Sequence, residues 1–296
     1  DPKRGGIDIA VRAGAVEELP ITDGYLHIAA VEDMFAMPVN GTAAVQPPIT
    51  NPPERLPAIA RRRQYEIPYA LLNRLFPPGE FNAIQPQWGY YGMAAEKPTD
   101  LSMGYDLAMR AGGEPSFEIR GQGGFVPLGE LMENISYLTT QVKLNKLKDE
   151  DEMVVGECIY LGEEIMRVDA IAEYGSEVWL TVARGVYDTV PAPQAAGQLA
   201  WFFEDEVGSD SVAYVGGEKV DGKVLPYTMA GRYPEDQAPI DTVNMNFRFY
   251  RPYPPGYVWL NNQWRWFTKT SLNKNGPVLN ISWTHRDRVA QEDTRI

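Results

Sequence analysis

The sequence predicts a mainly β protein with a few short helices and compact antiparallel β-units. The chain of 296 residues contains 27 glycines and 24 prolines, a content that favours many turns and short strands over long helices. Aromatic residues make up 11% of it, and these side chains suit pleated surfaces. Apolar and polar residues alternate in several short runs, which is the pattern of half-buried strands.

The clearest strand pattern lies between residues 156 and 203. Apolar runs at Cys158–Leu161, Ile165–Ile171, Val178–Val182 and Gln198–Phe203 are separated by charged or glycine-containing turns and by a Pro/Ala/Gly connection. The second run does not alternate strictly, so we expect a β-bulge or burial on both faces there. This stretch predicts a compact antiparallel β-unit.

The first region, residues 1–58, is predicted to be an extended arm with two short strands. The strand candidates are Ile7–Val11 and Tyr25–Ala30. Closely spaced prolines between residues 46 and 57 exclude a helix or a central strand. The arm either reaches a neighbouring subunit or is a surface linker.

Residues 59–150 are predicted to form a mixed α/β domain. We expect a helix over Arg61–Leu75 and a short helix over Leu128–Tyr137, with a strand at Leu101–Leu107. The arginines at its start, 61–63, are expected to lie on a solvated face or to pair with the acidic surplus. The acidic run 149–152 marks the end of this domain. It lacks the spaced ligands and glycine of a calcium loop, so it is predicted to be a solvated turn.

Residues 151–276 are predicted to form a second domain, made of β-strands. After the central unit, strands are expected at Gly217–Leu225 and Thr242–Phe249. A hairpin around Asn261-Asn262 follows. A further strand, Pro277–Trp283, opens the last part, residues 277–296.

The composition excludes several classes of protein. A net charge of −13 argues against a general nucleic-acid binder, because phosphate contacts need a basic footprint. The single cysteine, Cys158, rules out an internal disulfide and is predicted to be a small buried residue. No apolar segment approaches the length of a membrane span. The chain starts with Asp1 and not with Met, so we expect it to be processed or cut from a longer polypeptide.

The sequence offers no catalytic chemistry. With His27, His285 and one cysteine, a zinc site would need mostly carboxylates. Residues 121–124 are glycine-rich but lack the Lys-Ser/Thr pair of a phosphate loop, so they are predicted to be a turn. No nucleophile elbow accompanies His285. We therefore predict no catalytic residue, no metal site and no cofactor, and we expect a protein that is not an enzyme.

Clustered aromatic side chains are the candidate binding residues. Such side chains stack on sugars, and they also fill protein interfaces and small β-cores. The candidates are Trp88, Tyr90, Tyr91, Tyr253, Trp259, Trp264 and Trp266. An alternative function is therefore a receptor- or polysaccharide-binding module. A cell-wall hydrolase is a third and less favoured hypothesis.

Several ordered motifs between Gly156 and Arg288 carry a resemblance to a known family. They are Gly162–Ile165, Leu180–Gly185, Asp188–Ala192, Gly217–Pro226, Ala238–Val243, Arg251–Gly256 and Trp283–Arg288. This succession resembles the tail-tip proteins of tailed bacteriophages, a family that includes siphophage hub and central-fibre proteins and the similar protein of gene transfer agents. Relatives often carry a histidine where this chain has Gln194, a position that we expect to be structural.

The resemblance implies a structural role in a virion. It implies small antiparallel β-barrel or sandwich domains, with a barrel-like domain over residues 151–276, in a homotrimeric ring that closes the distal end of the tail tube. The implied partners are neighbouring distal tail, tail tube and tape-measure proteins, and a host cell-surface receptor. Leu279–Trp283 resembles the first strand of a fibronectin type III module. An acidic inner face would let DNA slide without sticking, since like charges repel, so no specific nucleic-acid binding is expected.

Overall fold

The computed structural model describes residues 11–16, 28–32, 56–203, 207–260, 263–264 and 280–287. The chain divides into two compact units, Asp1–Glu54 and Arg55–Ile296. In the first unit, β1 (Val11–Val16) pairs antiparallel with β2 (Ile28–Glu32), and the pairing register shifts between Ala13 and Val16. The remainder of the predicted arm, up to residue 55, lies outside the described residues.

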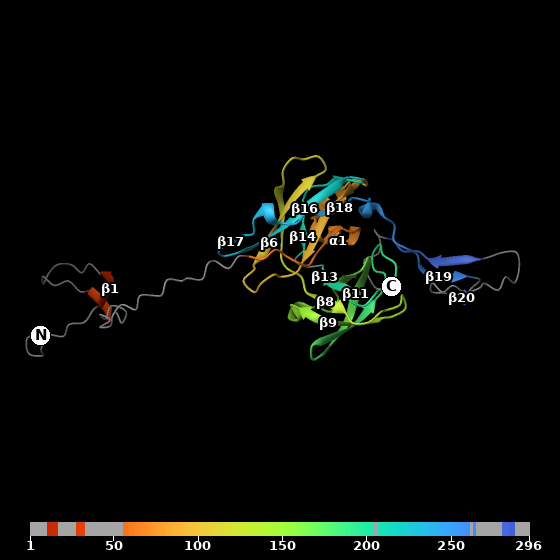
Figure 1. The fold of residues 1–296 in the computed structure, drawn as a ribbon, viewed down its shortest axis with the longest axis horizontal. Helices are drawn as coiled ribbons and strands as arrows, with labels where there is room; N and C mark the ends of the chain where they lie inside the picture. Colours follow the sequence, from red (N-terminus) through yellow and green to blue (C-terminus); the bar gives the residue numbers. More distant parts are fainter. Residues whose placement is uncertain are drawn as a thin grey trace, which may run out of the picture. The chain divides into compact units, whose positions relative to one another are not determined.

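The second unit contains a closed six-stranded barrel, with the strand order β10-β11-β12-β9-β8-β13 and antiparallel pairing throughout (Figure 1). Its strands are β8 (Leu128–Leu131), β9 (Gln141–Lys148), β10 (Cys158–Leu161), β11 (Glu164–Tyr174), β12 (Glu177–Ala183) and β13 (Leu199–Phe202). The mainly β fold is thereby confirmed. The register of β11 against β12 shifts between Val168 and Ala170, at the expected bulge. Cys158 is buried, as predicted.

The barrel starts earlier in the chain than the sequence indicated. The predicted helix Leu128–Tyr137 is wrong, because β8 pairs with β9 on one side and β13 on the other. Pairing on both sides satisfies the backbone groups that a helix would have satisfied internally. β8 and β9 both precede residue 151. The acidic run lies between β9 and β10, and its residues 150–152 are exposed, as expected for a solvated turn.

The barrel is inserted into another β structure, which we call the flanking unit (residues 56–127 and 207–251). Its strands form β14-β5-β3, β15-β4 and β17-β16-β6-β7 sheets, with β18 also paired to β16. The insertion lies between β7 and β14. The elements of the flanking unit are β3 (Arg62–Glu66), α1 (Tyr69–Leu75), α2 (Pro78–Ala83), β4 (Trp88–Gly89), β5 (Tyr91–Ala95), β6 (Gly104–Ala111), β7 (Glu118–Gly123), β14 (Gly208–Ser209), β15 (Tyr214–Val215), β16 (Lys219–Thr228), β17 (Gly231–Arg232) and β18 (Asp241–Asn244), with 3₁₀ turns at Glu235–Gln237 and Arg248–Tyr250.

The predicted helix Arg61–Leu75 is a strand followed by a helix. β3 pairs with β5 over its full length, and α1 begins only at Tyr69. Pro68 separates the two elements. A residue before proline is disfavoured in the helical region, so Ile67 cannot continue a helix into Pro68 easily. The three arginines pair with acids, as expected: Arg61 with Glu96, Arg62 with Asp241 and Arg63 with Glu163.

The glycine-rich stretch 121–124 is mostly a strand and not the predicted turn. Gly121 and Gly123 belong to β7, which crosses β14 at very short range. A Cβ on Gly121 would lie 2.1 Å from the Ser209 carbonyl oxygen, and one on Gly123 would lie 2.5 Å from the Gly208 nitrogen. Glycine is therefore required at this crossing because the two backbones touch.

The predicted strand Thr242–Phe249 ends early, since β18 ends at Asn244. The chain then leaves the sheet, and Phe247 adopts a left-handed conformation with φ 55°. Beyond it, β19 (Gly256–Leu260) pairs with β20 (Gln263–Trp264), which confirms the hairpin around Asn261-Asn262. β21 (Ile281–Thr284) pairs with β19. The fibronectin-like module stays a prediction.

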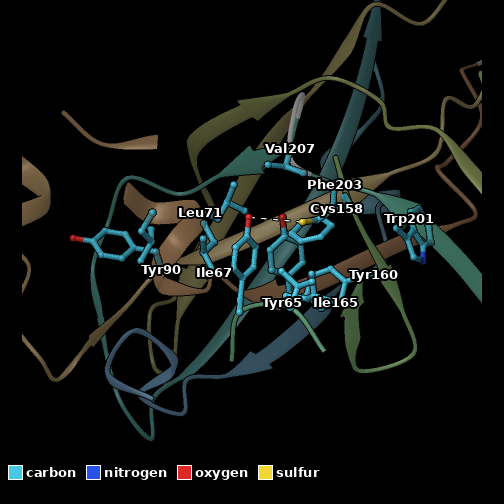
Figure 2. Close-up of a cluster of buried hydrophobic side chains, with 14 of the residues drawn as sticks. Tyr65, Ile67, Leu71, Tyr90, Cys158, Tyr160, Ile165, Trp201, Phe203 and Val207 are labelled. Carbon is cyan, nitrogen blue, oxygen red and sulfur yellow. Dashed lines mark hydrogen bonds between the residues drawn. The ribbon is translucent and has the colours of Figure 1, made fainter. Parts of the chain in front are cut away.

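The barrel and the flanking unit share one hydrophobic core. Tyr65 from β3 packs on Tyr160 from β10, with ring centroids 5.2 Å apart, and on Phe203 at 5.7 Å. The rings of Tyr160 and Phe203 are tilted against each other, with centroids 4.3 Å apart. Figure 2 shows these rings together with Cys158 in the middle of the cluster. The shared core fixes how the two structures meet, and the cleft described next lies along this junction.

Candidate functional site: the cleft between the barrel and the flanking unit

A cleft of about 880 Å³ lies where the barrel meets the flanking unit. The flanking unit lines it with β3, β18 and the 3₁₀ turn that contains Arg248. The barrel lines it with the turn between β10 and β11, the loop after β12 and the start of β13. Arginines and carboxylates from both sides face it, together with amide side chains. This lining is suited to recognising charge and to hydrogen bonding.

One arginine from the flanking unit ties the two sides together. Arg248 donates from Nε and Nη2 to the two carboxylate oxygens of Asp188, at 2.9 and 2.8 Å. Its Nη1 donates to the Glu66 carbonyl oxygen at 3.0 Å and to the Tyr160 hydroxyl. Arg251 adds a contact to Asp188 at 3.1 Å. Such bidentate, charge-assisted contacts are among the strongest hydrogen bonds in proteins.

Both partners of this ion pair follow residues in a left-handed conformation. Tyr187 has φ 57° and precedes Asp188, and Phe247 has φ 55° and precedes Arg248. Large side chains cost roughly 1–2 kcal/mol each in this region. The strained turns aim the carboxylate and the guanidinium at each other, so the contacts of the junction hold backbone conformations that would be unfavourable alone.

A buried carboxylate supports the turn that carries Arg248. Glu66 accepts hydrogen bonds from the backbone nitrogens of Asn246 at 2.6 Å and Arg248 at 2.7 Å. Its side chain has little solvent contact, and burial raises the pKa of this carboxyl, while the two backbone donors act in the opposite direction. Glu66 therefore fixes the end of β18 against the end of β3.

On the barrel side, a buried ion pair fixes the wall of the cleft. Arg184 donates to both Glu164 oxygens at 2.7 Å, and neither side chain is more than 5% exposed. Glu164 also accepts from the backbone nitrogens of Gly185 and Ala192. Gln194 is buried beside it, with its Nε2 atom 3.5 Å from Glu164. Gln194 thus has a structural position, in line with the expectation from the sequence.

Arg63 makes fewer hydrogen bonds than Arg62 and Arg248, two other arginines of the cleft. Its guanidinium lies over the Tyr160 ring, 4.4 Å from the centroid. It contacts Glu163 at 3.3 Å, but that glutamate side chain is 98% exposed. The Nε atom of Arg63 is buried and has no hydrogen-bond partner among the described residues. This donor is therefore unsatisfied within the described residues and shielded from solvent.

The aromatic residues singled out in the sequence are buried or half-buried wherever the structure describes their side chains. Tyr90 and Tyr91 are buried, at 6% and 0% exposure, so they do not offer stacking faces to a glycan. Trp88 and Tyr253 are half-buried and pack against the shared core. Trp259 is half-buried in β19. The Trp264 side chain and the whole of Trp266 lie outside the described residues.

Only some of the cleft residues could be identified from the sequence. Arg184 and Asp188 lie in two of the motifs noted in the sequence, and they bind the Ala192 carbonyl oxygen and the Arg248 guanidinium respectively. Arg63 and Arg248 carried no signal of a site, because their partners are distant in sequence. His285 is exposed near β21.

Within the described ranges, no three histidine, cysteine, aspartate or glutamate side chains gather as metal ligands. Among the helices in those ranges, none has the length and apolar character needed to span a membrane.

No protein-family model matches the chain, and no curated protein is significantly similar to it.

Proposed function

We propose that this chain is a structural protein of a phage virion. It forms part of the hub or central fibre that closes the distal end of the tail tube of a siphophage, and it takes part in host attachment and DNA delivery. The proposal rests on the ordered motifs between Gly156 and Arg288 and on what their residues do in the fold.

One observation carries the proposal: the motif residues stabilise the barrel wall and its junction with the flanking unit. Glu164 and Arg184 come from two of the recognised motifs and form the buried pair of the barrel wall. Asp188 and Arg251 come from two others and form part of the contact between the barrel and the flanking unit. These residues form ion pairs that hold the fold in place, and the wall of a tail requires such a rigid fold.

The expected partners follow from the same role. The chain assembles with itself as a homotrimer and contacts neighbouring distal tail, tail tube and tape-measure proteins. Contact with a host receptor belongs to the attachment step. A protein with this role is located in the virion, at the tip of the tail.

Native mass spectrometry of the purified chain tests the ring. We expect a trimer, and a mass that remains monomeric at micromolar concentrations would contradict a self-assembling ring.

Electron microscopy of virions labelled with antibodies against the chain tests the location. We expect label at the distal end of the tail. Label on the capsid, or along the length of the tube, would overturn the proposal.

A further inference from the structure

We propose that Arg286 is a releasable latch. It holds the C-terminal sheet (β19, β20 and β21) on the barrel, and its release lets this sheet swing away while the junction between the barrel and the flanking unit stays closed. The inference concerns a movement within the chain and stands independently of the assembly role proposed above.

The C-terminal sheet has little apolar contact with the rest of the chain in the part that the structure describes. Val258 and Trp259 of β19 are half-buried, and Ile281 and Trp283 of β21 are more than half exposed. The hydrophobic clusters of described residues include no side chain from these strands. A segment with few buried apolar contacts opens at a low cost in free energy, so other contacts must keep this sheet in place.

Arg286, just after β21, connects the sheet to the barrel. Its Nη1 and Nη2 atoms donate to the carbonyl oxygens of Gly185 and Tyr187, at 3.2 and 3.4 Å, in the loop after β12. Its guanidinium lies 5.4 Å from the centroid of the Tyr253 ring. The aliphatic part of the side chain lies beside β19, since a Cβ on Gly256 would be 3.4 Å from the Arg286 Cδ atom. Arg286 therefore packs on its own sheet and reaches across to the barrel.

The contact made by Arg286 is a weak one. Its partners among the described residues are the two carbonyl oxygens and the Tyr253 ring, with no carboxylate. Its Nε atom is buried without a hydrogen bond to those residues. Burial lowers the pKa of the guanidinium, because the charged form loses hydration. Long hydrogen bonds to neutral oxygens thus hold a half-buried cation that has no counter-charge there.

The junction contacts at the same barrel loop are stronger, so they persist when the latch opens. Asp188 directly follows Tyr187 and holds Arg248 through hydrogen bonds of 2.8 and 2.9 Å. Arg251 adds a contact of 3.1 Å to the same carboxylate, where the chain leaves the flanking unit. A short bidentate contact between two ions is stronger than long hydrogen bonds to carbonyl oxygens. The Arg286 contact is therefore the first to break.

The connector that leads into the sheet supplies the pivot. Residues 252–255 are Pro-Tyr-Pro-Pro, and prolines fix φ and make a semi-rigid spacer. Gly256 follows this spacer, and the absence of a Cβ makes rotation easiest there. With Arg251 held by Asp188, release of Arg286 lets the sheet turn about Gly256.

Distances between spin labels, measured by pulsed electron paramagnetic resonance on the full chain, test the latch. Labels on Ser176→Cys and Ser282→Cys report on the barrel and the C-terminal sheet. Labels on Ser176→Cys and Ala230→Cys report on the barrel and the flanking unit. All three positions are exposed, and the native Cys158 is buried and is left in place. Labelled chain is diluted with unlabelled chain, so that the distances are those within one chain.

Arg286→Gln should raise the ratio of released to docked sheet by about tenfold, because it removes hydrogen bonds from a charged donor. A second, broader set of distances should then appear between positions 176 and 282, while those between positions 176 and 230 stay unchanged. Arg286→Lys keeps the charge but lacks the fork that reaches both carbonyl oxygens, so it should give a smaller increase. Arg232→Gln is the matched control, since Arg232 is an exposed arginine of β17 paired with Asp106, and it should change neither set.

Two outcomes would overturn the inference. Unchanged distances between positions 176 and 282 in Arg286→Gln would show that this side chain does not hold the sheet. Broadening of both sets of distances would show a general loosening of the fold and not the release of one sheet. If Arg286→Gln does not fold, Arg286→Lys decides between the same outcomes.

Discussion

Asp188 and Arg248 form a bidentate ion pair across the junction, with donor–acceptor distances of 2.8 and 2.9 Å, and each residue directly follows a left-handed one. The carboxylate comes from the loop after β12, and the guanidinium comes from the turn after β18. Residues 60 positions apart in sequence thereby join the barrel to the flanking unit.

Asp188→Asn should destabilise the protein by about 3–5 kcal/mol, because it leaves a buried guanidinium without its counter-charge. Urea unfolding measures the change. The control is Asp169→Asn, which breaks the pair of a 40%-exposed aspartate with Arg167 and should cost at most about 1 kcal/mol. Equal effects of the two variants would show that the junction pair contributes no more than a surface contact.

Gly121→Ala should destabilise by about 1–3 kcal/mol, because the new methyl group meets backbone atoms that cannot rotate away. The added carbon would lie 2.1 Å from the Ser209 carbonyl oxygen. Gly79→Ala is the matched control. Gly79 lies in α2 with open space around it, so the same change should stabilise by about 0.5–1 kcal/mol. Thermal unfolding compares both, and a stable Gly121→Ala variant would disprove the close crossing of β7 and β14.

Because the Glu66 carboxyl is buried, we expect the free energy of unfolding of the protein to depend on pH. Burial raises the pKa of its carboxyl above the ordinary value of 4.5. In the window between the two values the folded state binds more protons than the unfolded state, so its contribution to stability falls as pH rises. Glu66→Gln removes this contribution. The free energy of unfolding of the wild type, relative to the variant, should therefore decrease as pH rises above the ordinary value of about 4.5. Urea unfolding at several pH values checks it, and parallel profiles would contradict it.

Short-range patterns in the sequence predicted the central β-unit well. The runs between Cys158 and Phe203 became β10 to β13, and the broken alternation after Ile165 became a bulge. Alternation reports which side chains face a core, so it identifies strands wherever neighbouring strands cover one face. The hairpin at Asn261-Asn262 was likewise predicted from residues that are close together in the sequence.

The same patterns failed where distant segments decide the structure. Arg62–Glu66 has the composition of a helix start, yet its pairing with β5 makes it a strand. Leu128–Leu131 is a strand because β9 and β13 lie on its two sides. Residues 121–123 have the composition of a turn, but they form a strand that β14 crosses. In each case contacts between distant parts of the chain outweigh a weak local preference.

By itself, the sequence determined the mainly β class, the strands of the central unit, and the motif residues Glu164, Arg184, Asp188 and Arg251. Only the tertiary structure decided that the barrel is inserted within the flanking unit, and that Arg63, Asp188 and Arg248 meet at one cleft. The physical reason is that strand periodicity is a property of neighbouring residues, whereas ion pairs and sheet edges depend on which distant strands lie side by side.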